Sequence, residues 1–375
     1  MKILMANYEF PPIGGGAGNA HLCLLKEYAC IDDLEVDVLT SAPKPGFTIE
    51  KFSRNITIYK VGLHKKDLHF WRKIEVIEWL LKAEFHYRGL LRQNHYDLAH
   101  AFFAFPTAWL CYRYAARLPY IISLRGSDVP GLNPRLALDY KLLAPVFRQI
   151  WKNAVAIVAC SEGLRKRALQ FLSTVDIDVI PNGVDISRFS QSHPRDNLQI
   201  FRLLTVGRLS ASKRIELLIA AVAQMNKKYP GITLTIAGGG GLQENLRKIV
   251  EQSRLQGIVR ILGWIPSWKM PQLYQQHDLF VSATAQEGMS NAMLEAMASG
   301  LPVVTTACEG TDELITDNGI VVNDAEPSAI EHEILALFHD HQKYIRMCAA
   351  SRIKASAFRW ERLAGEYLET CRRAI

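Results

Sequence analysis

One stretch in the last third of the chain most constrains how the protein can fold. Residues 278–282 form an apolar run of strand length, and residues 303–306 form a second one after a glycine and a proline. Between them, residues 292–298 are good helix formers, with Ser290 or Asn291 as the expected N-cap. A strand, a helix and a second strand in this order predict an α/β fold with a parallel sheet.

The start of this helix is predicted to bind an anionic ligand. Met293 or Leu294 would be the third helical residue, so no acidic side chain competes for the first N–H groups. Gly288 allows close backbone approach, and the positive helix end favours a phosphate. Glu287 lies at the mouth of this site, and Glu295 lies one turn inside it, where it can accept bonds from hydroxyl groups. A ligand that carries both phosphates and sugar hydroxyls fits this site best. The alternative interpretation is that Glu287 and Glu295 are only surface carboxylates.

Length and composition indicate a globular protein with two or three domains. The chain has 375 residues, of which 49% are hydrophobic and 22% charged. It contains no uninterrupted apolar run long enough to span a membrane, and the first residues read directly as a strand. The seven cysteines are scattered without a C-x-x-C pair, which argues against a disulfide framework or structural zinc and suits a reducing cytoplasm.

Positive charge is concentrated in one part of the chain. The net charge is +7, but residues 51–150 hold 16 Lys and Arg against 7 Asp and Glu. This excess indicates an anionic partner, such as nucleic acid, a membrane surface or a phosphorylated lipid, or else a solvated basic face.

A helix with aromatic, apolar and basic residues is expected inside this basic region. Trp71, Ile74, Ile77 (or Glu78), Leu81 and Phe85 recur at helical spacing, with lysines and arginines around them. The stripe indicates either a helix that rests on an anionic membrane surface or a domain helix whose apolar stripe faces the core. We favour the core-facing interpretation.

A glycine-rich loop follows the first strand. Residues 8–18 contain two prolines and Gly15 and Gly16, and such a loop between strand and helix usually contacts phosphate or sugar. The dinucleotide fingerprint would need glycine at Asn19 or His21, and no Walker lysine is present. A dehydrogenase or P-loop enzyme is therefore disfavoured.

Charged residues follow several other expected strands. Arg208 and Lys213 come after residues 201–206, and two cations at a strand-to-helix turn suit a diphosphate leaving group. Arg125 and Asp128 follow another strand, where Arg125 can clamp an acceptor phosphate or pair with Asp128 to brace the turn.

Together these segments resemble glycosyltransferase family 4. The E-x7-E signature of the family stands here as Glu287 and Glu295, followed by Ala-Met-Ala-Ser-Gly-Leu-Pro. Residues 11–16 resemble its Pro-Pro-x-x-Gly-Gly loop, residues 178–185 resemble the segment that ends its first domain, and residues 358–369 resemble its final helix. The resemblance runs nearly end to end.

The resemblance implies a GT-B fold, in which two Rossmann-like parallel-sheet domains face each other across a cleft. We expect an acceptor-binding domain over residues 1–190, a nucleotide-sugar-binding domain over residues 198–356, and a C-terminal helix over residues 357–375 that crosses back. Polar residues 190–197, with a proline, would form the linker.

The resemblance also implies roles for single residues. Arg208 and Lys213 would bind the donor diphosphate, Glu295 the ribose, and Glu287 would face the sugar near the reaction centre as the catalytic candidate. The other expected donor contacts are Gly15, Gly16, Trp264, Ile265, Gly288, Met289, Ser290 and Asn291.

Two first-domain motifs bear on catalysis and the acceptor. The family's His-x-His strand has Phe102 at its second histidine position, which leaves His100 as a catalytic candidate or a structural residue. The Arg-Gly-x-Asp-Val-Pro-Gly motif of a surface-polysaccharide subset matches residues 125–131, so Arg125 and Asp128 are the expected acceptor contacts.

The implied activity is a retaining transfer from a nucleoside-diphosphate sugar, a UDP-sugar in the first place, to a saccharide or polyprenyl-linked acceptor in surface polysaccharide or lipopolysaccharide synthesis. We identify no metal-binding Asp-x-Asp motif and expect no metal or other cofactor. The alternatives are an epimerase or phosphorylase of the same fold, or a basic nucleic-acid binder; no recognisable nucleic-acid module is present, so we expect no nucleic acid partner. We expect a cytoplasmic protein, peripheral on the inner face of the membrane.

Overall fold

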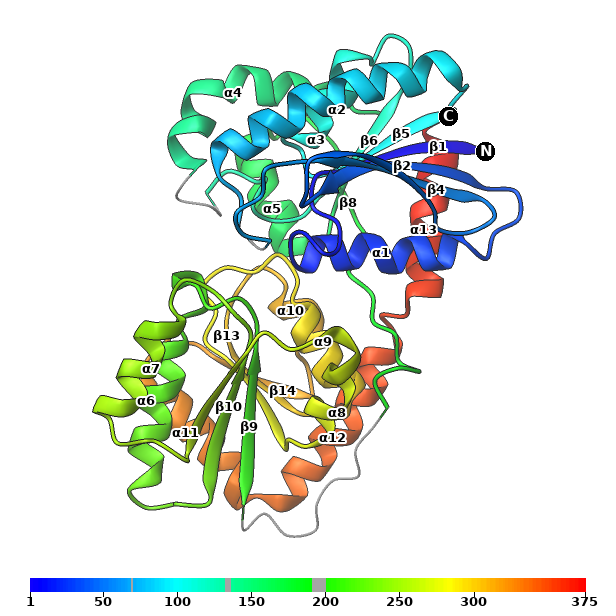
Figure 1. Cartoon of the computed structure of the whole chain (residues 1–375). Coiled ribbons are helices and arrows are strands. Elements are labelled where there is room, and N and C mark those ends of the chain that lie inside the picture. Colours follow the sequence, from blue (N-terminus) through cyan, green and yellow to red (C-terminus); the bar gives the residue numbers. More distant parts are fainter. Residues whose placement is uncertain (69, 132–135, 191–199) are drawn as a thin grey trace. The chain divides into compact units, whose positions relative to one another are not determined.

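The chain folds into two compact units. The computed structural model describes residues 1–68, 70–131, 136–190 and 200–375. Unit 1 comprises Met1–Asn182 and Trp360–Ile375, and unit 2 comprises Gly183–Arg359 (Figure 1). The expected linker lies, from residue 191 onward, outside the described residues.

Unit 1 is built on an eight-stranded sheet of order β3-β4-β2-β1-β5-β6-β7-β8. All neighbouring strands are parallel except β3 and β4, which are antiparallel. The central strand β1 is a run of buried apolar residues, as expected for a sheet covered on both faces. The strands are β1 Lys2–Asn7, β2 Glu35–Ala42, β3 Gly46–Lys51, β4 Ile56–Gly62, β5 Leu98–Phe102, β6 Tyr120–Leu124, β7 Ala156–Ala159 and β8 Asp178–Val179.

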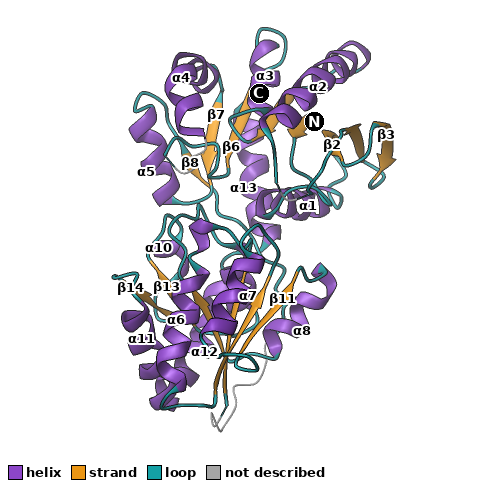
Figure 2. Cartoon of the chain, turned by 60° about the vertical axis from the view of Figure 1, so that its left-hand side comes forward, coloured by secondary structure: helices purple, strands orange, loops and turns teal. Residues whose placement is uncertain are grey.

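Helices cover both faces of this sheet. The C-terminal helix α13 packs beside α1 on one face, while α2, α3 and α4 form a layer on the other (Figures 1 and 2). The helices are α1 Gly16–Tyr28, α2 Lys73–Gln93, α3 Thr107–Arg113, α4 Ala137–Lys152, α5 Glu162–Phe171 and α13 Trp360–Arg373.

The helix α2 forms where expected, but the core-facing interpretation of its stripe is wrong. The side chains of Ile74, Ile77, Leu81 and Phe85 are 63%, 51%, 71% and 75% exposed. A second set at helical spacing faces the sheet instead: Trp79, Ala83, Tyr87, Leu90 and Leu91. The helix has two apolar stripes, and only one of them can pack on the sheet.

Unit 2 has a six-stranded sheet of order β11-β10-β9-β12-β13-β14, with every neighbouring pair parallel. Its core includes Phe201, Leu203, Ile219, Leu234 and Ile236, all fully buried. The elements are β9 Phe201–Val206, α6 Ile215–Asn226, β10 Ile232–Ala237, α7 Gln243–Gln252, β11 Val259–Gly263, α8 Met270–Gln275, β12 Leu279–Ser282, α9 Asn291–Ala298, β13 Val303–Thr306, α10 Thr311–Leu314, β14 Gly319–Val322, α11 Pro327–His339 and α12 His341–Ser356.

In each sheet, the side on which successive strands are added changes once. In unit 1 the chain returns past β1 to place β5 on its other side, and in unit 2 it returns past β9 to place β12 there. The parallel-sheet prediction for each half of the chain is therefore confirmed. Open parallel sheets bind ligands beyond the carboxyl ends of the strands at such a reversal, which directs attention to the loops after β9, β12, β1 and β5.

Candidate functional site

Glycines hold the loops at the carboxyl edge of the unit 2 sheet close together. Gly238 has φ +137°, and a Cβ there would lie 1.9 Å from the carbonyl oxygen of Gly207. The N–H of Leu209 donates to the carbonyl oxygen of Gly239 at 2.9 Å, and the N–H of Gly238 donates to the carbonyl oxygen of Gly263 at 2.8 Å. The loops after β9, β10 and β11 thus form one braced backbone assembly.

An ion pair spans the reversal point of this sheet. Lys213 follows β9 and Glu287 follows β12, and the ammonium of Lys213 contacts Oε2 of Glu287. Their side chains are 21% and 26% exposed, so solvent reaches both. The structure therefore brings together two residues that the sequence assigned to the same ligand, and each currently neutralises the other.

Arg214, which the sequence did not single out, ties the β9 loop to its neighbours. Its backbone has φ +44°, in the left-handed region that side chains rarely adopt. Its guanidinium donates to the carbonyl oxygens of Ala283 and Thr284 at 2.7 and 3.2 Å and to Oγ1 of Thr306 at 3.3 Å. These bonds fix the position of Lys213 beside the ends of β12 and β13.

The start of α9 is capped as predicted. Ser290 is the N-cap, and its Oγ accepts a hydrogen bond from the N–H of Met293 at 3.3 Å. The first turn carries no acidic residue. Gly288 and Met289 are buried beneath the loop after β13, whereas Asn291 is partly exposed.

The loop after β13 was not identified from the sequence. A Cβ on Gly310 would lie 2.6 Å from the carbonyl oxygen of Gly288, so only glycine allows this approach. The carboxylate of Glu309 accepts the N–H of Glu287 at 3.0 Å, and the N–H of Gly310 donates to the Glu287 carbonyl at 3.3 Å. The backbone of Glu287 is thereby held on both sides.

Glu295 is placed by a tyrosine from α8. The hydroxyl of Tyr274 donates to Oε2 of Glu295 at 2.9 Å and also contacts the carbonyl of Ala292 at 3.2 Å. Burial raises the pKa of Glu295 to about 7, although the Tyr274 hydroxyl and the positive charge of Arg188 both act to lower it. The sequence did not single out Tyr274, whose hydroxyl orients this candidate residue.

The other expected donor residues of unit 2 lie at the same sheet edge. Arg208 follows β9 and is exposed. After β11, Trp264 is 63% exposed and Ile265 is partly buried. Two cations, the start of α9 and two carboxylates therefore gather along the carboxyl edge of one sheet.

In unit 1 the glycine loop leads directly into α1. Gly15 precedes the helix and Gly16 is its first residue. Gly14 has φ +93°, and its N–H donates to the carbonyl of Leu68 at 2.8 Å. This bond holds the loop beside the segment that follows β4.

His100 is fully buried within β5. Its Nε2 forms a hydrogen bond with Oγ of Ser123 at 2.8 Å, and its ring lies 4.9 Å from that of Phe102. Burial, and next the charge of Arg125, lower the pKa of His100 to about 3, so the imidazole is neutral at physiological pH. These contacts favour the structural interpretation of His100.

Asp128 braces the turn after β6, but not through the side chain of Arg125. Its carboxylate accepts the backbone N–H groups of Ala104 at 2.7 Å and Arg125 at 2.9 Å, and burial raises its pKa. At 3% exposure it is not placed to contact an acceptor. The guanidinium of Arg125 instead bonds Asn182 and, at 3.5 Å, the hydroxyl of Tyr367 on α13.

An Asp-x-Asp spacing does occur in the chain, but it lies away from the candidate site. Residues 176–178 read Asp-Ile-Asp. They lie at the start of β8, opposite the carboxyl edge, and Asp178 pairs with Arg373 at 3.3 Å. Within the described ranges, no group of three or more His, Cys, Asp or Glu side chains is arranged to hold a metal ion.

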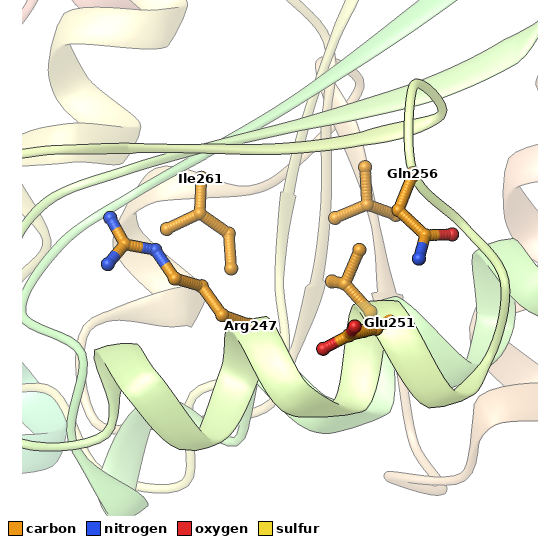
Figure 3. A pocket seen from close by; sticks show the side chains of 6 residues that line it. Arg247, Glu251, Gln256 and Ile261 are labelled. Carbon is orange, nitrogen blue, oxygen red and sulfur yellow. The ribbon is translucent and has the colours of Figure 1, made fainter.

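A hollow of about 300 Å³ lies elsewhere on unit 2 (Figure 3). It is formed by the last turns of α7 and the first residues of β11, near the amino ends of the strands. It therefore does not coincide with the candidate site. Its lining residues are Arg247, Val250, Glu251, Gln256, Val259 and Ile261.

Comparison with known families covers most of the chain. Residues 14–188 match the model described as Glycosyltransferase Family 4. Residues 200–340 match the model described as Glycosyl transferases group 1. The two matched segments fall largely within units 1 and 2 respectively.

Individual proteins resemble the chain over nearly its full length. An uncharacterized glycosyltransferase of Methanocaldococcus jannaschii is 25% identical, with 98% of this chain and 96% of that protein covered. The sucrose-phosphate synthase of Thermosynechococcus elongatus has a TM-score of 0.85 at 20% identity, covering 99% and 98% of the two chains. The Anabaena protein HepE in complex with UDP-glucose has a TM-score of 0.74 at 22% identity, covering 99% of each chain.

Proposed function

The chain is a GT-B glycosyltransferase of the family 4 type, and on this premise we propose that it transfers a sugar from a UDP-sugar to a saccharide or lipid-linked saccharide, with retention at the anomeric carbon. The observation that carries the proposal is the group of Lys213, Glu287, Glu295 and Tyr274 at the reversal point of the unit 2 sheet. The UDP-glucose complex of HepE supports the choice of donor.

The donor diphosphate takes the place that Glu287 now holds at Lys213. A diphosphate carries more negative charge than one carboxylate, so it displaces Glu287 from the ammonium and is also attracted by the positive end of α9. Arg208, exposed at the same edge, adds a second cation. As the glycosidic bond breaks, negative charge grows on the departing diphosphate, and these donors stabilise it.

The two carboxylates then act on different parts of the donor. Glu295, held by Tyr274, accepts hydrogen bonds from ribose hydroxyls. Glu287, released from Lys213, faces the sugar and stabilises the positive charge that develops at the anomeric carbon. Trp264 and Ile265 contribute backbone contacts to the base. In this proposal the cations and helix N–H groups make a metal ion unnecessary.

The acceptor is proposed to be a saccharide carried by a lipid, used in surface polysaccharide or lipopolysaccharide synthesis at the inner face of the membrane. The Arg125 motif and the basic excess of residues 51–150 support this assignment. No helix among the described residues is long and apolar enough to cross a bilayer. An enzyme of this kind meets such an acceptor from the membrane surface.

Thermal shift with UDP, GDP, CDP, ADP and NAD, each without metal, tests the donor proposal. A ligand at a hundred times its dissociation constant stabilises the protein by about 2.7 kcal/mol, which moves the transition by a few degrees. We expect UDP to give the largest shift and Glu295→Ala to abolish it, while Lys248→Ala, an exposed lysine on α7, retains it. A shift with NAD alone would contradict the proposal.

A further inference from the structure

The outer face of α2 is apolar at the end of the helix nearest the carboxyl edge of the sheet. Ile74, Ile77, Leu81 and Phe85 lie in line at i, i+3, i+7 and i+11, each more than half exposed. The sheet is covered by the opposite stripe, so these side chains take no part in the core of unit 1. Soluble surfaces rarely carry four large apolar side chains in line without a partner.

The neighbouring helix α4 has a similar outer face. Leu138 and Leu142 are 64% and 68% exposed, while Tyr140, Phe147, Ile150 and Trp151 face inward. Lys141 and Lys152 lie on the exposed side of the same helix. The outward face of α4 therefore alternates apolar and basic side chains.

The two helices belong to one layer and begin at the same sheet edge. Together with α3 they cover the same face of the unit 1 sheet (Figures 1 and 2). The ammonium of Lys73, at the start of α2, contacts the carboxylate of Asp139, in the first turn of α4, at 2.7 Å. Because α2 follows β4 and α4 follows β6, both starts lie at the carboxyl edge, beside the glycine loop and the turn of Arg125.

The charges on this layer are suited to an anionic partner. Its acids are already neutralised: Glu78 pairs with Lys82, Glu84 with Arg113 and Asp139 with Lys73. Four exposed cations, by contrast, form no ion pair within the described part of the chain, and they continue the outer stripes toward the helix ends. These are Arg88, Arg92, Lys141 and Lys152.

We propose that the outer faces of α2 and α4 dock the enzyme on an anionic lipid bilayer, with Leu81, Phe85 and Leu142 among the side chains that enter the interface and the four cations bound to headgroups. A helix that lies in the interface combines such an apolar stripe with basic flanks. This deepens the membrane part of the proposed function and assigns it to defined residues. The docked surface brings the carboxyl edge of unit 1 next to a lipid-borne acceptor.

Vesicle sedimentation of the full chain tests the surface. Vesicles of phosphatidylcholine alone are compared with vesicles that also contain phosphatidylglycerol, at low and high salt. We expect binding to the mixed vesicles at low salt, and at least tenfold weaker binding for the triple variant Leu81→Ser, Phe85→Ser, Leu142→Ser. Replacing Arg88, Arg92, Lys141 and Lys152 by glutamine weakens binding about fivefold for each charge removed, on the anionic vesicles only.

The matched control is Ile353→Ser with Ile375→Ser, which removes two exposed apolar side chains outside this surface. The control is expected to bind as the wild type does. Failure of the wild type to bind at low salt, or equal losses in the control and the triple variant, would overturn the proposal.

Analytical ultracentrifugation without vesicles separates lipid docking from self-association. A wild-type dimer that the triple variant converts to monomer would show that the surface binds a second copy instead. The UDP thermal shift reads unit 2, so its persistence in every variant shows that the donor site is intact. It also separates failure of the docking surface from failure of the donor proposal.

Discussion

The carboxyl edges of the two sheets use their polar residues in opposite ways. In unit 2, Lys213 and Glu287 are reachable from solvent and are bonded mainly to each other. In unit 1, His100 and Asp128 are buried. His100 forms a hydrogen bond with Ser123, and Asp128 accepts hydrogen bonds from backbone N–H groups. The Lys213–Glu287 pair can exchange partners with a ligand that enters from solvent, whereas the side chains of His100 and Asp128 are closed off from solvent. Charged and polar side chains at the carboxyl edges of the two sheets are therefore open to a ligand in unit 2 and closed to one in unit 1.

The largest effect that would test this contrast is loss of catalysis in unit 2. Lys213→Ala removes the cation that meets the departing diphosphate, and we expect kcat/KM to fall about 10²- to 10³-fold. The assay is release of the nucleoside diphosphate from the donor, with Lys248→Ala as the control. An activity within threefold (roughly 0.7 kcal/mol) of the wild type would show that Lys213 only neutralises Glu287.

The next effect concerns the backbone that supports this edge. Gly238→Ala places a methyl group against the carbonyl of Gly207 and forces alanine to φ +137°, and we expect a loss of about 2–4 kcal/mol in unfolding free energy. Gly241→Ala, in the same turn but with open space around it, is expected to change stability by less than about 0.5 kcal/mol. Urea denaturation measures both. Equal unfolding free energies for the two variants would contradict the close contact between Gly238 and the carbonyl of Gly207.

In unit 1 the expected loss is in stability and not in donor binding. Asp128→Ala leaves the buried N–H groups of Ala104 and Arg125 without an acceptor, which costs about 1–3 kcal/mol for each group. The UDP thermal shift should be unchanged, because unit 2 is untouched. Asp128→Asn keeps one carbonyl acceptor, so its unfolding free energy should fall by less than that of Asp128→Ala. A variant that is stable but inactive would instead assign Asp128 to the acceptor.

The smallest effect is a pH dependence at Glu295. Its pKa is raised by burial to about 7, above its value in the unfolded chain, so ionisation destabilises the folded form as pH rises from about 4.5 to 7. Glu295→Gln should therefore melt a few degrees higher than the wild type at pH 8, and at about the same temperature at pH 4. The wild type should also bind UDP more tightly as pH rises through 7, whereas the variant should show no such rise. If the difference in melting temperature between Glu295→Gln and the wild type were the same at pH 4 and pH 8, the raised pKa of Glu295 would be contradicted.

Local patterns in the sequence were enough to predict the parallel sheets and the N-cap at Ser290. The resemblance to family 4 implied that Lys213 and Glu287 serve one site, and the structure places both at the same sheet edge. Tyr274 and Gly310 were missed, since their roles depend on segments that meet only in the folded chain. Neither a helix tyrosine nor a glycine after a strand signals, by itself, which loop it will touch.

The error at α2 has a related cause. Both of its apolar stripes have helical spacing, so periodicity alone cannot decide which one packs on the sheet. Trp79 and Tyr87, on the stripe that packs, are among the largest fully buried side chains of the described residues. The rejected stripe is then left on the outside, which is why the docking surface became visible only in the structure.

In the proposed function, UDP binding also shows whether the unit 2 sheet has formed completely, because Lys213 follows β9 and Glu287 follows β12. The chain between these residues contains β10 and β11 with their helices, and β12 must then insert beside β9 on the side away from β10. A nascent or truncated chain that stops before β12 can pair three strands of the sheet and still have no donor site. UDP should consequently stabilise only chains in which that insertion is complete, and in a pulse-labelled refolding experiment it would act only after β12 has paired with β9.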